Sequence, residues 1–135
     1  MALNPKTGVA SRNLALNAAF DILNSGKLII YDGTQPTDAD TALGAQVDLA
    51  DLTFGATAFA AASAGSKVAN SITQDSSANA SSTATWATLV ASTRATVGTM
   101  DMSVGTSSAN LNLNSTAISS GAAVSCSSLT ISQAA

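Results

Sequence analysis

Hydrophobic residues change their spacing along the chain near residue 27. Before that point they recur every three or four positions, the spacing of one helix face: Leu16, Ala19, Phe20 and Leu23. Ser11 is a residue type that caps helices, and the Asn-Ser-Gly run at 24–26 is typical of a helix end. The pattern therefore predicts one helix, over residues 12–24.

After residue 27 the apolar spacing shortens to two, the period of a β-strand, and Gly, Asn and Ser separate the runs. The predicted strands cover residues 28–31, 47–54, 67–73, 82–90, 97–104, 110–114 and 124–131. In the last of them the apolar face switches between Cys126 and Leu129, which indicates a β-bulge. One helix followed by about seven or eight short strands predicts a mainly β fold, either an antiparallel β-sandwich or a barrel-like domain.

The chain is short enough to form one domain, with an arm in front of it. Residues 1–10 contain Pro5 and carry no periodic pattern, so they are predicted to be an extended N-terminal arm; residues 11–135 are predicted to form a single β-rich domain. Three aromatic side chains are the expected anchors of its core: Trp86, Phe54 and Phe20. Trp86 is the largest, and we expect it to bridge two facing sheets about 10 Å apart.

Composition indicates that this core is thin. Ala, Ser and Thr fill 64 of the 135 positions, and the chain has only three Phe, one Trp and one Tyr. Because alanine buries little apolar area, each one contributes little to stability. We therefore expect the protein to be stabilised by neighbours, either copies of itself in a trimer or another homo-oligomer, or a larger partner.

Charge and hydropathy argue against two classes of partner. The net charge is −3 and the five Lys and Arg residues are scattered, so no basic stripe is present to bind nucleic acid. No apolar run reaches the ~18 residues of a membrane-spanning helix. The N-terminal residues lack the apolar stretch of a secretion signal, so we expect synthesis in a cytoplasm and no membrane partner.

The inventory of side chains disfavours catalysis. The chain contains no His and no Glu, which excludes a Ser-His-Asp triad and leaves its single cysteine, Cys126, without a histidine base. We expect Cys126 to be a small buried hydrophobe, with a disulfide between copies as the alternative. The sequence thus predicts no enzyme activity and no cofactor.

Two groups of aspartates come nearest to a site. Asp32, Asp38 and Asp40 do not have the spacing of a calcium loop, so a solvated turn is expected and no metal site is predicted. Asp48 and Asp51 could form the acid pair of a glycoside hydrolase. However, the chain has almost no aromatic residues from which to build a platform for a sugar.

Several stretches of strand and turn, in a fixed order, cover most of residues 20–132. They are ILNSG at 22–26 running into LIIYDGTQP at 28–36, LADLTFG at 49–55, STATW at 82–86, MD at 100–101 with SVGT at 103–106, and LNLNSTAI at 111–118. Together they resemble a family of small virion proteins of tailed bacteriophages, encoded among head and tail genes. None of the stretches is a catalytic motif.

The resemblance implies a capsid decoration (cement) protein, which binds the outside of the phage head and stabilises contacts between major capsid protein subunits. The implied partner is the major capsid protein, and the implied location is the outer surface of the virion after synthesis in the bacterial cytoplasm. Capsid binding would use a sheet edge and the arm, through Leu3, Pro5, Lys6 and Val9. The alternatives are a tail or head-fibre component, and a carbohydrate-binding β-sandwich that aids adhesion to the host.

Overall fold

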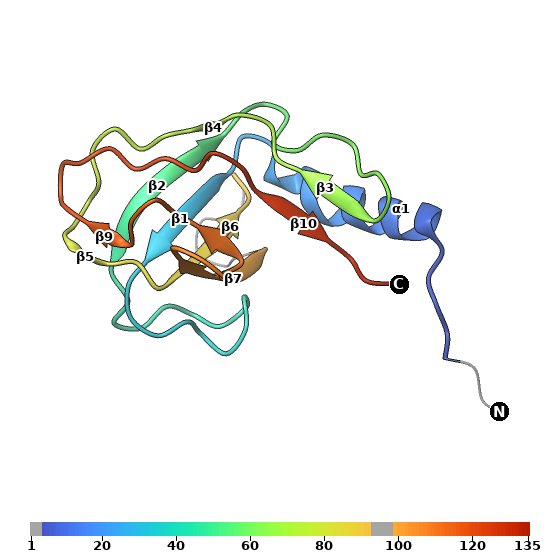
Figure 1. Ribbon diagram of the computed structural model, residues 1–135, viewed down its shortest axis with the longest axis horizontal. Helices are drawn as coiled ribbons and strands as arrows, with labels where there is room; N and C mark the ends of the chain where they lie inside the picture. The colour runs from blue at the N-terminus through green and yellow to red at the C-terminus, as the bar shows by residue number, and fades with distance from the viewer. Residues whose placement is uncertain (1–3, 93–98) are drawn as a thin grey trace.

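The computed structural model describes residues 4–92 and 99–135, and it shows one helix beside a set of short strands (Figure 1). The helix α1 (Val9–Phe20) runs into a turn of 3-10 helix, η1 (Asp21–Leu23). Within the described residues the strands are β1 (Lys27–Tyr31), β2 (Asp48–Phe54), β3 (Ser66–Val68), β4 (Ile72–Thr73), β5 (Ser82–Thr83), β6 (Trp86–Val90), β7 (Met100–Gly105), β8 (Leu111–Asn112), β9 (Ala117–Ile118) and β10 (Thr130–Ser132). A mainly β fold with one short N-terminal helix is therefore confirmed.

Six strands form one sheet, in the order β4-β2-β1-β6-β7-β8. Neighbouring strands are antiparallel except for the short parallel pair of β7 and β8. The sheet curls into a half-barrel, and two small pairs, β3 with β10 and β5 with β9, lie at opposite ends of it (Figure 1). The second large sheet that a sandwich requires is not found in the described part of the chain.

Successive residues of a strand point to opposite faces of the sheet. The main core lies against one of these faces. In β1, Leu28 and Ile30 are fully buried in that core, whereas Ile29 and Tyr31 belong to a separate cluster on the other face. The helix contributes Leu16 to the same core as β1. Helix and sheet therefore share one apolar interior.

A β-bulge in β2 changes which side chains reach the core. The pairing of β2 with β1 slips by one residue at Leu49, so that Leu49 and Ala50 are both buried in the main core. As a result Asp48 and Asp51, which are three positions apart, both lie on the face of the sheet opposite to the main core. This bulge sets up the acid pair described below.

The helix begins and ends earlier than the sequence predicts. It starts at Val9 with Gly8 as the cap residue, so the arm ends at Gly8 and the predicted cap, Ser11, lies inside the first turn. The regular helix then tightens into η1 instead of continuing to residue 24. Ser25 adopts a left-handed backbone with φ 58°, so the Asn-Ser-Gly run ends η1 and not α1.

Gly26 is required by a close approach between two segments of backbone. A Cβ at this position would collide with the carbonyl oxygen of Val90 and come within 2.9 Å of the carbonyl oxygen of Leu23. Only glycine therefore lets the chain pass from η1 into β1 while it lies against β6.

Two predicted strands are each divided in the structure. The strand predicted over 67–73 becomes β3 and β4, which belong to different sheets. Between them Asn70 donates its backbone N–H to the oxygen of Ala58 and its Nδ2 to the oxygen of Thr57, and these bonds turn the chain. The strand predicted over 82–90 likewise becomes β5 and β6, which pair with different partners.

The last predicted strand, over 124–131, is mostly irregular. Val124 makes a single bridge to Asp75, and only β10 is a true strand. The bulge predicted between Cys126 and Leu129 is therefore wrong, because there is no strand at that point for it to interrupt. The strand predicted over 97–104 starts outside the described residues and is observed as β7.

Trp86 is buried, but outside the main core. It forms a second cluster with Ile29, Tyr31 and Val90 on the opposite face of the sheet. Its ring stacks on Tyr31 with centroids 4.7 Å apart, and its Nε1 donates to the oxygen of Asp32 at 3.0 Å. The expectation that Trp86 bridges two facing sheets is wrong, because the alternation along β6 directs its neighbours, and not its own ring, into the main core.

The other two predicted anchors differ in burial. Phe54 is 2% exposed in the main core, with its ring centroid 5.5 Å from that of Phe59. Phe20 is only half-buried at the edge of the core, 6.2 Å from Phe59. Phe20 therefore packs at the boundary between the helix and the core, and not at the centre of the core.

Candidate functional site

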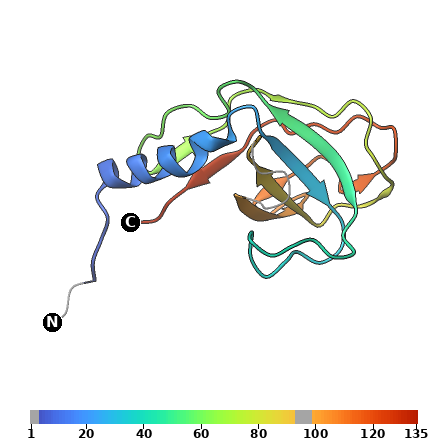
Figure 2. The ribbon, with the colours of Figure 1, turned by 180° about the vertical axis from the view of Figure 1, so that it is seen from behind.

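One end of the molecule is built differently from the half-barrel. There α1 packs against β3, which pairs with β10. This unit, the helical lobe (Val9–Phe20, Ser66–Val68 and Thr130–Ser132), projects to one side in both views (Figures 1 and 2). The N-terminal segment leaves the lobe and extends away from the rest of the molecule. The helix and the arm therefore lie next to each other at this end of the molecule.

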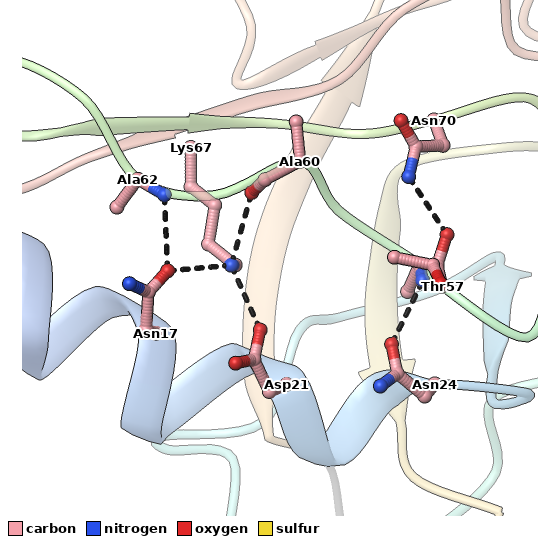
Figure 3. A network of polar contacts seen from close by, with 9 residues as sticks. Asn17, Asp21, Asn24, Thr57, Ala60, Ala62, Lys67 and Asn70 are labelled. Carbon is pink, nitrogen blue, oxygen red and sulfur yellow. Dashed lines mark hydrogen bonds and ion pairs between the residues drawn. The ribbon is translucent and has the colours of Figure 1, made fainter.

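A buried lysine holds the helix to β3. Lys67 is 1% exposed and is the one buried charged side chain among the described residues. Its Nζ lies 2.8 Å from Asp21 Oδ1, 2.8 Å from Asn17 Oδ1 and 3.0 Å from the oxygen of Ala60 (Figure 3). Each N–H of the ammonium group thus has an acceptor, which offsets the cost of burying its charge.

Asparagine side chains on the helix and directly after η1 satisfy backbone N–H groups of the segment after β2. The acceptor and donor pairs are Asn13 Oδ1 with Gly65 N at 2.9 Å, Asn17 Oδ1 with Ala62 N at 3.0 Å, and Asn24 Oδ1 with Ala58 N at 2.8 Å. These bonds allow that segment to stay irregular without leaving buried donors unpaired. Sequence reasoning missed this network, although the spacing of Asn13 and Asn17 by four positions is a signal that could have revealed it.

The side of the helix that faces away from the molecule is mostly apolar, with Ser11 as an exposed polar residue on it. Leu14 is 71% exposed, and Val9 and Ile22 are each 48% exposed. Exposed alanines at positions 10, 15, 18 and 19 lie between them. We call this surface, residues 9, 10, 14, 15, 18, 19 and 22, the outer helix face. Within the described residues no helix is long and apolar enough to cross a membrane.

The charged side chains of α1 and η1 point away from the outer helix face. Arg12 donates from Nη1 to the oxygen of Thr7 at 3.2 Å. Asp21 binds the buried Lys67. The outer helix face therefore carries no charge of either sign.

The predicted capsid-binding residues do not form one segment. Pro5 and Lys6 are exposed in the arm. Val9 is the first residue of α1 and belongs to the outer helix face. Leu3 lies outside the described residues. The arm and the helix face are nevertheless adjacent, because the chain passes directly from one to the other.

Asp48 and Asp51 form an interacting pair on the face of the sheet opposite to the main core. Lys27 Nζ lies 2.7 Å from Asp51 Oδ2, and Asn79 donates from Nδ2 to Asp48 Oδ1 at 3.1 Å. Burial, followed by the charge of Asp51, raises the pKa of Asp48 to about 6. The only Trp and Tyr of the chain stack on each other and are buried, so neither ring is open to a sugar beside this pair.

The aspartates at positions 32, 38 and 40 help to close a loop, and their carboxylates do not gather into one site. Asp32 Oδ1 accepts the N–H of Val47 at 2.7 Å. Asp38 Oδ1 accepts the N–H of Asp40 at 3.2 Å and the hydroxyl of Thr41 at 2.8 Å. These are turn-forming bonds, and in the part of the chain that the structure describes no group of three or more potential ligands could hold a metal ion.

Cys126 is 7% exposed in the main core, as expected for a small buried hydrophobe. Its thiol donates to the oxygen of Ser128 at 3.3 Å, and burial raises its pKa. A buried thiol that stays protonated is poorly placed for a disulfide between copies.

Comparison with known proteins supplies no relative. No protein-family model matches the chain, and no match is found among curated proteins or among solved structures.

Proposed function

We propose that this protein is a structural component of a phage virion, a capsid decoration (cement) protein that binds the outside of the head and stabilises contacts between major capsid protein subunits. The helical lobe carries the proposal. Its apolar outer helix face and its exposed arm lie together at one end of the molecule, where both can reach the same lattice of identical subunits.

The chemistry of this surface suits attachment that is repeated many times. The outer helix face carries no charge, so its contacts gain free energy from apolar burial and are insensitive to salt. The arm adds a second point of contact beside the first. Weak contacts made at two points by many copies combine into firm attachment to a head.

The same surface suits contact between copies, which would give the expected trimer or another homo-oligomer. In a symmetric interface a charge near the axis meets itself, and the outer helix face has none. Burial of Leu14 and Ile22 against a second molecule would add to the thin apolar interior of the monomer.

The strand and turn sequences between residues 20 and 132 that resemble small phage virion proteins support the virion setting. A tail or head-fibre component fits the same surface, and the number of copies per particle separates it from a decoration protein. A carbohydrate-binding role is disfavoured, because Trp86 and Tyr31 are buried and offer no open ring.

Sedimentation with empty phage heads tests the proposal. The full chain is expected to sediment with heads and to saturate at hundreds of copies, in proportion to the capsid subunits. A chain that lacks residues 2–6 is expected to bind less tightly while its unfolding midpoint stays unchanged, because the described residues among these, 4–6, are exposed. Binding to tail tubes, with none to heads, would sink the head assignment in favour of the tail alternative.

A further inference from the structure

The amine of Lys67 lies within hydrogen-bonding distance of both the amide of Asn17 and the carboxylate of Asp21 (Figure 3). Lys67 Nζ is 2.8 Å from Asn17 Oδ1. Because a C=O bond is about 1.23 Å long, Nζ lies at most about 4 Å from Cγ of Asn17. Reacting atoms in productive geometries stand about 3–3.5 Å apart, so a small rotation of the Asn17 amide brings the amine into contact with its carbon.

The surroundings of this amide favour attack on it. The N–H of Ala62 donates to Asn17 Oδ1 at 3.0 Å, and it would continue to do so as negative charge develops on that oxygen. Asp21 Oδ1 lies 2.8 Å from Lys67 Nζ, within reach to accept a proton from the amine. The lysine itself is 1% exposed, so little water competes with the Asn17 amide and the Asp21 carboxylate for its amine.

The third requirement is a route for the leaving group. A cavity of about 250 Å³ borders the three side chains and is also lined by Asn24, Thr57 and Phe59. It is open to solvent, and the side chain of Asp21, one of its lining residues, is 56% exposed. A small molecule released from the amide can therefore leave without movement of the fold.

We propose that Lys67 and Asn17 form an isopeptide bond in the folded protein without the help of an enzyme. Lys67 passes one proton to Asp21, and its neutral amine attacks Cγ of Asn17. The Cγ–Nζ bond forms while the carbonyl electron pair moves onto Oδ1. When that pair returns, the Cγ–Nδ2 bond breaks and the nitrogen leaves as ammonia, having taken a proton from Asp21.

The reaction is balanced without an oxidant, a reductant or a cofactor. Asp21 takes up the second proton that Nζ loses and releases it to solvent, so the carboxylate is regenerated. One amide replaces another and one ammonia is lost. The new bond joins α1 to β3 across 50 positions of sequence. It fixes the helix to this strand whether or not the protein binds a capsid.

The mass of the intact, purified chain tests this inference directly. After prolonged incubation at mildly alkaline pH, the wild-type chain is expected to be lighter than its calculated mass by about 17 Da, the mass of ammonia. Digestion should then give one branched peptide that contains both residue 17 and residue 67. A wild-type chain that keeps its full calculated mass overturns the proposal, and this outcome needs no variant that has to fold.

Three variants assign the roles. Lys67→Arg, which lacks the nucleophile, and Asp21→Asn, which lacks the proton acceptor, are expected to keep full mass. Lys27→Arg is the matched control, because Lys27 also lies 2.7 Å from a carboxylate, that of Asp51, but makes no bond to an amide side chain; it should still lose about 17 Da.

A cyclised asparagine loses the same mass as the proposed bond. Fragmentation separates the two, because a cyclised asparagine gives linear peptides only. Mass loss without a branched peptide therefore also overturns the proposal. None of these outcomes depends on binding to heads, so failure of the bond and failure of the capsid assignment are seen separately.

Discussion

The half-barrel and the helical lobe are stabilised by different interactions. In the half-barrel, large aliphatic and aromatic side chains are buried on both faces of the sheet. In the lobe only Leu16 of α1 and Ile131 of β10 are buried in the main core, and Lys67 and the asparagine bonds to backbone add the polar contacts that hold the helix in place. The lobe meanwhile leaves Leu14 in water. A region fixed partly by directional polar bonds can leave large apolar side chains exposed and still hold its shape.

The largest effect is expected in the half-barrel, from Trp86→Ala. The change removes a fully buried ring and its stack on Tyr31, and should lower the free energy of unfolding by about 3–5 kcal/mol. Urea denaturation followed by far-ultraviolet circular dichroism measures it. If the loss is below about 1 kcal/mol, the second cluster contributes little and the half-barrel depends on the main core alone.

A smaller loss is expected in the lobe, from Asn13→Ala. This change leaves the N–H of Gly65, which Asn13 accepts at 2.9 Å, without its partner, at a cost of about 1–2 kcal/mol. Hydrogen exchange should accelerate in α1 and β3 but not in β1 or β6. Asn4→Ala, in the exposed arm, is the control and should change nothing. Equal acceleration in both regions would show that they unfold as one unit.

A pH-dependent effect of about 1 kcal/mol is expected at Asp48. Burial and Asp51 raise the folded-state pKa of Asp48 to about 6, above its ordinary value of 3.8. The folded state therefore holds the proton more tightly than the unfolded state, and stability should fall as pH rises from about 4 to about 6, then level off. The change in the free energy of unfolding is small because solvent screens the charge of this half-buried group.

Asp48→Asn should remove that slope and raise stability at neutral pH, because the amide oxygen can still accept from Asn79. Denaturation at a series of pH values compares the variant with the wild type. A slope that persists in Asp48→Asn would assign it to another carboxylate.

The smallest change in stability is expected from Leu14→Lys on the outer helix face. Leu14 is 71% exposed, so the free energy of unfolding should move by less than about 0.5 kcal/mol. Self-association, measured by sedimentation velocity, and attachment to heads should both weaken. Leu43→Lys is the matched control, since Leu43 is 43% exposed in the loop between β1 and β2. If both variants associate like the wild type, the face is not an interface.

The helix, the central strands and the mainly β class could be predicted from sequence because each follows a local period. Leu28 and Ile30 alternate with Ile29 and Tyr31, and that alternation alone places a strand. The bulge at Leu49 could not be predicted, because it arises from the register with β1. The face occupied by Trp86 depends on which side of the sheet the helix covers, and no local pattern records that.

The lobe shows the same limit at the level of the site. Lys67 reads as one polar residue in a short strand, and its burial becomes visible only when α1 brings Asn17 and Asp21 to it. The spacing of these two residues by four positions is local, but their partner lies 50 positions from Asn17. The apolar outer helix face went unpredicted because the helix has apolar residues on both sides, with Leu14 two positions from the buried Leu16, and a local pattern does not say which side is covered.

The burial of the single tryptophan has a practical consequence for spectroscopy. Trp86 lies in the half-barrel with its ring centroid 4.7 Å from that of Tyr31, the only tyrosine of the chain. Both strong near-ultraviolet chromophores therefore report on one region, and the helical lobe contributes only weak phenylalanine absorption from Phe20. Tryptophan emission will follow melting of the sheet while remaining blind to detachment of the helix, so a fluorescent label on the lobe is needed to observe the two events separately.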